Sequence, residues 1–285
     1  MLSFPNLSTA KAALIRDLLR HKRTREAERA FVVEGTKQIS ELLRGNSPAL
    51  RAVVVTPTFL EKSHQAMQSV LGQTRAAVYT CRDTTFEKLS DVSASQGILA
   101  IVRQPEWDQE TILRQPRVFG IYGECLQDPA NVGAIIRTAL AFHADALWLS
   151  PDSADAFNPK VVRATAGALL MLPVFSLTDI GFFARHRCTL VAAEPPRKGG
   201  RGIRAITSLP SRAILALGNE SRGLSETTLK EAPLRFHIPV NPTVESLNVA
   251  ASAAIALFYL SGLPRDERKA KGVERKGEKE DESGA

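Results

Sequence analysis

The sequence has few of the features that mark a membrane, secreted or metal-binding protein. It contains no apolar run of about 18 residues, so we expect no membrane span. Its first residues lack the regions of a secretory signal, which favours a cytoplasmic location. Cys81, Cys125 and Cys188 form no CxxC pair, and the histidines are scattered. This pattern argues against a disulfide framework and predicts no metal site.

Several nucleotide-binding and hydrolase signatures are also missing. No Walker A sequence occurs, and neither does the GxGxG loop of a Rossmann-type methyltransferase. Gly200–Ala205 formally fits GxGxxA, but two prolines separate it from the preceding strand and it opens no convincing helix. In Gly218–Gly223 the serine falls one place late for GxSxG, which argues against a hydrolase elbow.

Positive charge, by contrast, is abundant, with a formal net charge of +7. The segment after residue 263 is balanced in sign, so the folded part carries the excess. Basic residues far outnumber acidic ones between residues 11 and 29, and this density predicts contacts with phosphates. A solvated basic helix is the alternative. The candidate phosphate-binding residues are Lys11, Arg20, Lys22, Arg23 and Arg25.

Strands and helices alternate twice along the chain, which predicts two α/β domains. We expect a small domain over 1–103, a linker over 104–116, a second domain over 117–263 and a disordered charged tail over 264–285. The short apolar strands of the second domain show little alternation, which predicts a parallel sheet covered on both faces. They span 117–122, 146–150, 189–193, 213–217 and 236–240, with helices at 132–142, 159–172, 179–185 and 247–260.

The first candidate motif, Asn131-Val-Gly-Ala-Ile-Ile-Arg137, follows the first strand of the second domain. Asn131 can cap a helix whose apolar residues recur at i, i+3 and i+4. Arg137 lies off that apolar stripe, one turn after Gly133, where the glycine leaves space for a ligand. A surface arginine beside a tolerated glycine is the alternative.

The second motif is Leu217-Gly-Asn-Glu-Ser-Arg-Gly-Leu224, in which a buried strand runs into a glycine-bounded loop and Ser225 caps a helix. Ligands of open α/β sheets bind at the carboxyl ends of strands, and the glycines permit close backbone approach. A third glycine-containing loop spans Glu194–Arg204. Its basic residues Arg197 and Lys198 are candidates for phosphate contact, although a plain loop explains them equally well.

The third motif begins with Ile238 and leads into an apolar helix predicted over 247–260. Ser246 stands where the N-cap of that helix is expected. Glu245, Ser246 and Asn248 crowd this end, either as simple caps or as part of a site. Because the helix is apolar nearly all round, it must be buried or covered by a partner.

Taken together and in this order, these three motifs resemble those of the SpoU/TrmH branch of the SPOUT RNA methyltransferases. Asn158–Gly167, which includes Arg163, is similar to the family's intervening segment. The first domain resembles the family's L30e-like substrate-binding module, through Phe31–Gly35 and the basic helix before it.

The resemblance implies a SPOUT α/β domain with a C-terminal trefoil knot and a homodimer formed through knot helices. It implies that backbone groups of Leu217, Gly218, Ile238 and Leu247 hold S-adenosylmethionine. The reaction would move a methyl group to a ribose 2′-hydroxyl of RNA without a metal.

Among the site residues, the resemblance assigns the catalytic role to Arg137, with Asn131, Glu220, Ser246 and Asn248 shaping the site. An arginine stays protonated in proteins, so we expect Arg137 to orient the ribose and stabilise the oxyanion rather than remove a proton.

Because members of this family that act on tRNA often lack an L30e-like domain, the resemblance implies an rRNA substrate, and we expect 23S rRNA. A tRNA 2′-O-methyltransferase and a non-catalytic RNA-binding or ribosome assembly protein remain the alternatives.

Overall fold

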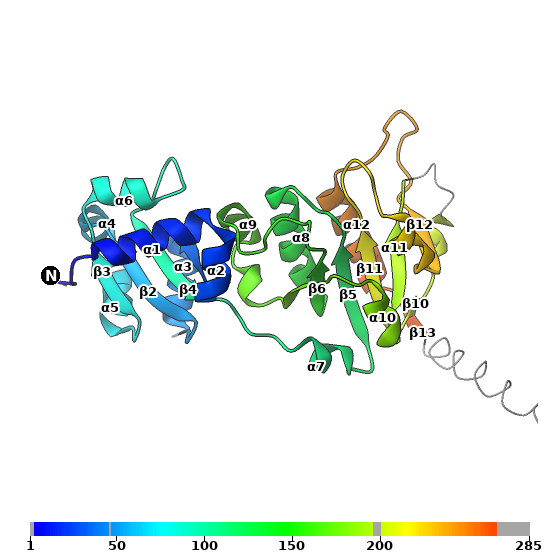
Figure 1. The fold of residues 1–285 in the computed structure, drawn as a ribbon, viewed down its shortest axis with the longest axis horizontal. Coiled ribbons are helices and arrows are strands. Elements are labelled where there is room, and N and C mark those ends of the chain that lie inside the picture. Colours follow the sequence, from blue (N-terminus) through cyan, green and yellow to red (C-terminus); the bar gives the residue numbers. More distant parts are fainter. Residues whose placement is uncertain (1–2, 46, 196–200, 267–285) are drawn as a thin grey trace, which may run out of the picture. The chain divides into compact units, whose positions relative to one another are not determined.

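The computed structural model describes residues 3–45, 47–195 and 201–266, and the chain divides into two compact units (Figure 1). The first unit contains the chain up to Glu106 together with Asp155–Leu170, and the second begins at Trp107 and resumes at Met171. Both units are α/β, and the predicted two-domain α/β architecture with a parallel sheet is confirmed.

The first unit is built on a four-stranded sheet in the order β1-β4-β2-β3. β4 runs antiparallel to both of its neighbours, and β2 runs parallel to β3. The strands are β1 (Ala30–Glu34), β2 (Leu50–Val55), β3 (Ala77–Thr80) and β4 (Ile98–Arg103). The helices are α1 (Thr9–Arg20), α2 (Lys22–Glu28), α3 (Thr36–Arg44), α4 (Pro57–Lys62), α5 (Gln65–Gln73) and α6 (Asp83–Leu89).

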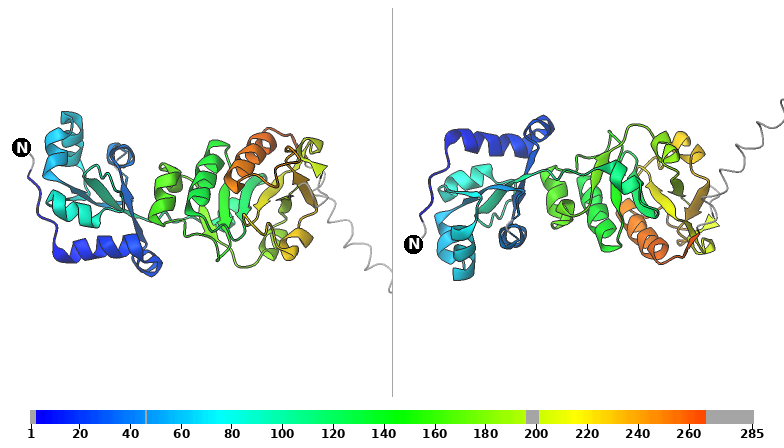
Figure 2. Two further views of the ribbon diagram at one scale, coloured as in Figure 1. Left: turned by 90° about the horizontal axis from the view of Figure 1, so that it is seen from above. Right: turned by 90° about the horizontal axis from the view of Figure 1, so that it is seen from below.

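Helices cover both faces of this sheet, as the views in Figure 2 show. On one face, Ile15 and Leu18 of α1 pack with Phe86 of α6 against alternate strand residues. α1 begins at Thr9 because the Ser8 side chain accepts a hydrogen bond from the Lys11 backbone N–H. The apolar side chains of α1 face the sheet, whereas its basic residues are exposed to solvent.

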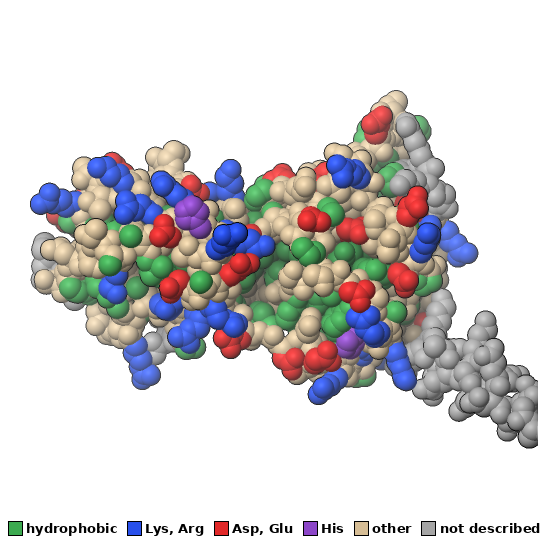
Figure 3. Space-filling model, viewed as in Figure 1, with side chains coloured by type: hydrophobic (Ala, Val, Ile, Leu, Met, Phe, Trp, Pro, Cys, Tyr) green, Lys and Arg blue, Asp and Glu red, His purple; other side chains and the backbone are tan. Residues whose placement is uncertain are grey.

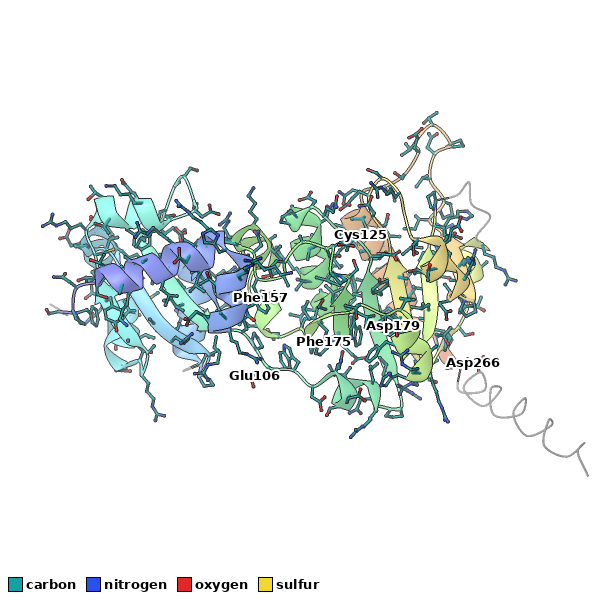
Figure 4. All side chains as sticks on the ribbon, viewed as in Figure 1. Glu106, Cys125, Phe157, Phe175, Asp179 and Asp266 are labelled. Atoms are coloured by element: carbon teal, nitrogen blue, oxygen red, sulfur yellow. The ribbon has the colours of Figure 1, made fainter. Side chains whose placement is uncertain are left out.

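Residues 155–170, which the sequence placed in the second domain, pack against β1 of the first unit. Phe157, labelled in Figure 4, lies 5.1 Å from Phe31 between ring centroids. The predicted helix 159–172 is shorter, because α9 (Pro159–Thr165) ends at Ala166 with φ of 50° and a 3-10 turn, η1 (Ala168–Leu170), follows. This left-handed residue breaks the α-helical hydrogen-bond ladder.

The second unit holds a seven-stranded sheet in the order β7-β6-β5-β11-β8-β12-β9, in which every pair is parallel. β5, β6 and β11 are almost wholly buried, as strands covered on both faces should be. The strands are β5 (Val118–Gly123), β6 (Ala146–Leu149), β7 (Val174–Ser176), β8 (Thr189–Ala193), β9 (Arg201–Gly202), β11 (Arg212–Leu217) and β12 (Leu234–His237).

Two long helices, α8 (Pro129–Ala141) and α12 (Val249–Ser261), pack against each other on one side of this sheet (Figure 2). The other side is covered by α7 (Gln109–Leu113), α10 (Gly181–Arg185) and α11 (Glu226–Lys230), which enclose a core around Trp148 and Phe183. α7 lies inside the predicted linker. Its Leu113 is buried in this core, so part of that segment belongs to the second unit.

The chain beyond residue 263 also differs from the sequence-based expectation where the structure describes it. Arg265–Asp266 form β13, which pairs in parallel with β10 (Leu209–Pro210), whereas a disordered tail was expected from residue 264. The Arg265 guanidinium lies 4.7 Å from the centroid of the Phe119 ring, and this stacking fixes the strand. The rest of the predicted tail lies outside the described residues.

Candidate active site

A cavity of 380 Å³ opens at the carboxyl ends of β8, β11 and β12. Such strand ends are where open parallel sheets bind ligands, and the volume suits a small molecule. The four predicted cofactor-binding residues, Leu217, Gly218, Ile238 and Leu247, all line the cavity. The other lining residues used below are Glu194, Glu220, Ser246 and Val249.

A chain of side-chain hydrogen bonds joins three predicted site residues that are distant in sequence. The Asn248 amide donates to the Asn131 carbonyl oxygen at 3.0 Å, and the Asn131 amide donates to Glu220 Oε1 at 2.9 Å. Asn131 is 7% exposed, so losing either partner would leave a buried polar group unsatisfied. The three residues form a fixed polar relay, named here the Asn–Asn–Glu relay.

The helices α8 and α12, which position Asn131 and Asn248, begin at other residues than the sequence predicted. α12 begins at Val249, and Asn248 is its N-cap, accepting from the backbone N–H of Ala250 and Ala251. The prediction that Ser246 is the N-cap of this helix is therefore wrong, although Ser246 lines the cavity. α8 is capped by Asp128 rather than Asn131, because Pro129 fills the first helical position. Asn131 lies inside the helix, and its amide is free to join the relay.

The loop after β11 is a tight hairpin closed between Asn219 and Gly223, whose backbones exchange hydrogen bonds of 3.1 and 2.9 Å. A Cβ on Gly218 would lie 2.2 Å from the Gly223 carbonyl carbon, so the second motif requires a glycine here. Asn219, which the sequence reading missed, donates to the carbonyl of Cys125 at 2.8 Å. Cys125, labelled in Figure 4, is the second residue after the end of β5. Asn219 thereby holds the Glu220 loop against the loop after β5.

A second missed residue, Glu124, organises the start of α11. Its carboxylate accepts from the Ser225 backbone N–H and hydroxyl and from the Thr228 hydroxyl, each at 2.8 Å. Ser225 is the N-cap of α11, as predicted. Glu124 also lines a second hollow of 820 Å³ on the far side of the Asn219–Gly223 hairpin. A glutamate directly after a buried strand was the available signal for this role.

Tyr122 lies near the end of β5, two residues before Glu124. Burial raises the pKa of Tyr122 far above its ordinary value, and the negative charge of Glu124 adds to the shift. The phenol is therefore neutral at physiological pH and cannot act as a phenolate base.

Arg137 is exposed on α8, one turn beyond the buried Gly133. In the described part of the chain, no hydrogen bond or ion pair holds its guanidinium. Arg137 thus shares a helix with Asn131 of the relay but is not hydrogen bonded to the relay. The arginine remains available to a substrate.

Four of the predicted RNA-contact residues, Lys11, Arg20, Lys22 and Arg23, are exposed on α1 and α2. Lysine and arginine side chains project from this unit on the face drawn in Figure 3. Lys22 pairs only loosely with Glu26, at 3.8 Å between exposed groups, and such a pair is worth little.

Arg25 does not fit the predicted role. It is 3% exposed, its guanidinium pairs with Asp155 at 2.7 Å, and it donates to the Leu18 carbonyl at 2.7 Å. The helical period turns this one basic residue inward, so Arg25 is a structural residue and not an RNA contact. Arg163 is partly exposed and paired with Asp91 at 3.1 Å. Arg197 and Lys198 lie outside the described residues.

Comparison with known proteins agrees with the fold and the motifs. The family model described as SpoU rRNA Methylase family matches residues 120–258, and the model of the MRM3-like substrate binding domain matches residues 15–100. In the described residues, no helix is long and apolar enough to cross a membrane, and no group of three or more His, Cys, Asp or Glu side chains could hold a metal ion.

Two curated relatives and one solved structure illustrate the similarity. The chain is 28% identical to the 23S rRNA (guanosine(2553)-2′-O)-methyltransferase RlmP of Bacillus subtilis, over 90% of this chain and 99% of the relative. It is 27% identical to a 23S rRNA (uridine(2479)-2′-O)-methyltransferase of Streptomyces viridochromogenes, over 84% of each. The crystal structure of the SpoU methyltransferase AviRb from that organism, in complex with AdoMet, shares the fold at a TM-score of 0.78 and 24% identity, covering 89% of this chain and 97% of that one. The chain therefore carries a SpoU rRNA methylase domain over residues 120–258, preceded by an MRM3-like substrate-binding domain over residues 15–100.

Proposed function

We propose that this protein transfers a methyl group from S-adenosylmethionine to a ribose 2′-hydroxyl of RNA, with 23S rRNA as the substrate. The observation that carries the proposal is the Asn–Asn–Glu relay, which ties the first, second and third motifs together beside the cavity. Relatives with this chemistry on 23S rRNA align over most of the chain.

The residues of the cavity fit the cofactor. Leu217, Ile238 and Leu247 offer apolar surface for a purine, and Gly218 permits close approach to the backbone. Glu194 brings a buried carboxylate, which complements the hydrogen-bond donors and the positive charge of S-adenosylmethionine. When bound, the cofactor supplies a methyl group attached to a sulfonium sulfur. This sulfur is a good leaving group, because it departs as a neutral thioether.

The protein residues then have to place the hydroxyl and compensate the charge that develops on it. We assign Arg137 to orient the ribose and phosphate and to stabilise the oxyanion, since a guanidinium stays protonated. The relay holds Glu220 in place, and Ser246 completes the wall of the cavity. Placing these groups in advance lowers the entropic cost of alignment.

The exposed basic residues of α1 and α2 are proposed to bind the RNA backbone. The side chains of Lys11, Arg20, Lys22 and Arg23 are exposed, so they can replace phosphate counterions. Arg163 adds a partly exposed charge on α9 of the same unit. We propose a cytoplasmic location, because the relatives that methylate 23S rRNA are bacterial proteins.

We also propose a homodimer and a trefoil knot in the methylase unit. Ile255 and Phe258 of α12 are 41% and 70% exposed, so this helix presents apolar surface that a second copy would cover. Phe258→Glu should lower the dimer fraction strongly in analytical ultracentrifugation, because the charge would be buried at the contact. An unchanged sedimentation coefficient in that variant would remove α12 from the interface.

One pair of experiments tests the proposed function directly. Calorimetry with S-adenosylmethionine should show binding, and its absence would favour a non-catalytic RNA-binding protein. Mapping ribose methylation in the rRNA of cells with and without the protein should reveal one missing 2′-O-methyl group. A methyl group missing from tRNA instead would move the substrate to that class.

A further inference from the structure

A carboxylate without a partner is buried in the wall of the cofactor cavity. Glu194 directly follows β8 and is 8% exposed. Its Oε2 is buried and receives no hydrogen bond from any described residue. The backbone is nevertheless held firmly, since the Glu194 N–H donates to the Phe236 carbonyl of β12 at 2.8 Å. A buried acceptor of this kind is costly unless a ligand supplies a donor.

The strand order fixes where Glu194 stands in the cavity. β8 lies between β11 and β12 in the sheet. The loop after β11 carries Glu220, and the chain after β12 carries Ile238 and Leu247. Among the ends of β11, β8 and β12, Glu194 therefore lies in the middle, between the polar relay on one side and the apolar residues Ile238 and Leu247 on the other.

The same order determines which part of the cofactor meets Glu194. The sulfonium has to lie near the Asn–Asn–Glu relay, where the reaction takes place. The purine favours the apolar side formed by Ile238 and Leu247. The ribose joins the purine to the sulfonium in the cofactor, so it lies at the middle strand end, next to Glu194. The amino-acid portion is attached beyond the sulfonium, away from Glu194.

We propose that Glu194 is a specificity-determining residue that accepts hydrogen bonds from the vicinal hydroxyls of the cofactor's ribose. A carboxylate has two acceptor oxygens and so matches a pair of hydroxyl donors. An acidic side chain near a strand end binds a ribose hydroxyl in the same manner in dinucleotide-binding folds. The inference rests on the proposed function, because it assumes that the cavity binds an adenosyl cofactor.

The first test compares binding and stability in Glu194→Gln. By calorimetry the variant should bind S-adenosylhomocysteine about tenfold to a hundredfold more weakly, because a charge-assisted hydrogen bond is removed. Without ligand its melting temperature should be equal to or higher than that of the wild type, since an unpaired buried charge is removed. A merely structural glutamate would lower the melting temperature instead, and that result would overturn the proposal.

The second test identifies the bound group with a series of ligands. The weaker binding of Glu194→Gln should persist with 5′-methylthioadenosine, which lacks the amino-acid portion, and with S-inosylhomocysteine, which lacks the purine amino group. For the 2′,3′-dideoxy form of 5′-methylthioadenosine, the affinities of the wild type and Glu194→Gln should differ by no more than about twofold. The substitution and the loss of the hydroxyls remove the same interaction, so their effects do not add. Equal weakening for the hydroxyl and dideoxy forms would overturn the proposal.

Glu231→Gln is the matched control, because it removes one negative charge from an exposed position on the same unit. It should bind all of these ligands as the wild type does. If the wild type fails to bind S-adenosylhomocysteine at all, the proposed function fails. If the wild type binds it and Glu194→Gln binds it equally well, only the role of Glu194 fails.

Discussion

The two units of this protein use polar residues in opposite ways. In the methylase unit, Asn131, Glu220 and Asn248 are bound to one another, and their positions are fixed. In the substrate-binding unit, the basic residues of α1 and α2 stand in solvent, and the one that is buried, Arg25, has a structural role. Fixed groups suit chemistry, which needs alignment, whereas solvated charges suit phosphate binding, which needs long-range attraction.

Substitution of Arg137 is the strongest test of the difference between the two units. Arg137→Ala should lower methyl transfer by about 10² to 10³-fold or more, because a charge that stabilises the oxyanion is removed. Calorimetry should show nearly unchanged cofactor binding, since Arg137 does not line the cavity. Full activity in single-turnover assays with rRNA would remove Arg137 from the catalytic residues.

Arg25 provides the largest expected effect on stability. Arg25→Ala should destabilise the first unit by about 3–5 kcal/mol, because Asp155 and the Leu18 carbonyl would be left without a buried partner. Urea unfolding measures this change. The neighbouring Arg23→Ala is the control and should stay within about 0.5 kcal/mol of the wild type, as exposed substitutions do. Equal stability of the two variants would contradict the structural role of Arg25.

Asn131→Ala tests whether the relay acts as a unit. Removing its amide takes away the hydrogen bonds to Glu220 Oε1 and from the Asn248 amide, so methyl transfer should fall by about tenfold to a hundredfold. Asn248→Ala should have a similar effect, and the double variant should be little worse than either single one. Strictly additive effects on the rate constant would show that the two asparagines act independently.

The smallest effect is expected on the basic surface. Replacing Arg20 and Arg23 by alanine should weaken RNA binding and lower the slope of log K against log salt, by about 0.7 to 0.9 for each phosphate that is no longer neutralised. The single-turnover rate at saturating RNA should not change. Deleting the whole first unit is a poorer experiment, because residues 155–170 would be deprived of the surface on which they pack. An unchanged salt slope would place the RNA elsewhere.

Much of the fold could be predicted because its signals are local. The apolar strands with little alternation predicted a parallel sheet, and β8 has the predicted bounds. The helix starts were less predictable: Ser246 and Asn131 are good capping residues, but Asn248 and Asp128 cap the helices. Several neighbouring residues could cap each helix, and tertiary packing selects among them.

Leu217, Gly218 and Ile238 come together in one cavity because they stand at strand ends that the parallel sheet brings to one edge. Leu247 joins them from the segment that leads into α12. Glu194 and Glu124 also follow strands, but their roles could not be predicted. Like the role of Asn219, they depend on partners that are distant in the sequence or missing. Arg25 was misassigned for a related reason, because its ion-pair partner Asp155 lies 130 residues away in the chain.

The sequence by itself determined the two α/β domains, the three motifs and the excess of basic charge, because periodicity, glycine spacing and composition are properties of the chain. Only the tertiary structure decided which asparagine caps α12, which arginine is buried and which carboxylate faces the cavity unpaired. These outcomes depend on contacts between distant residues, whose hydrogen bonds and burial exist only once the strands and helices have packed.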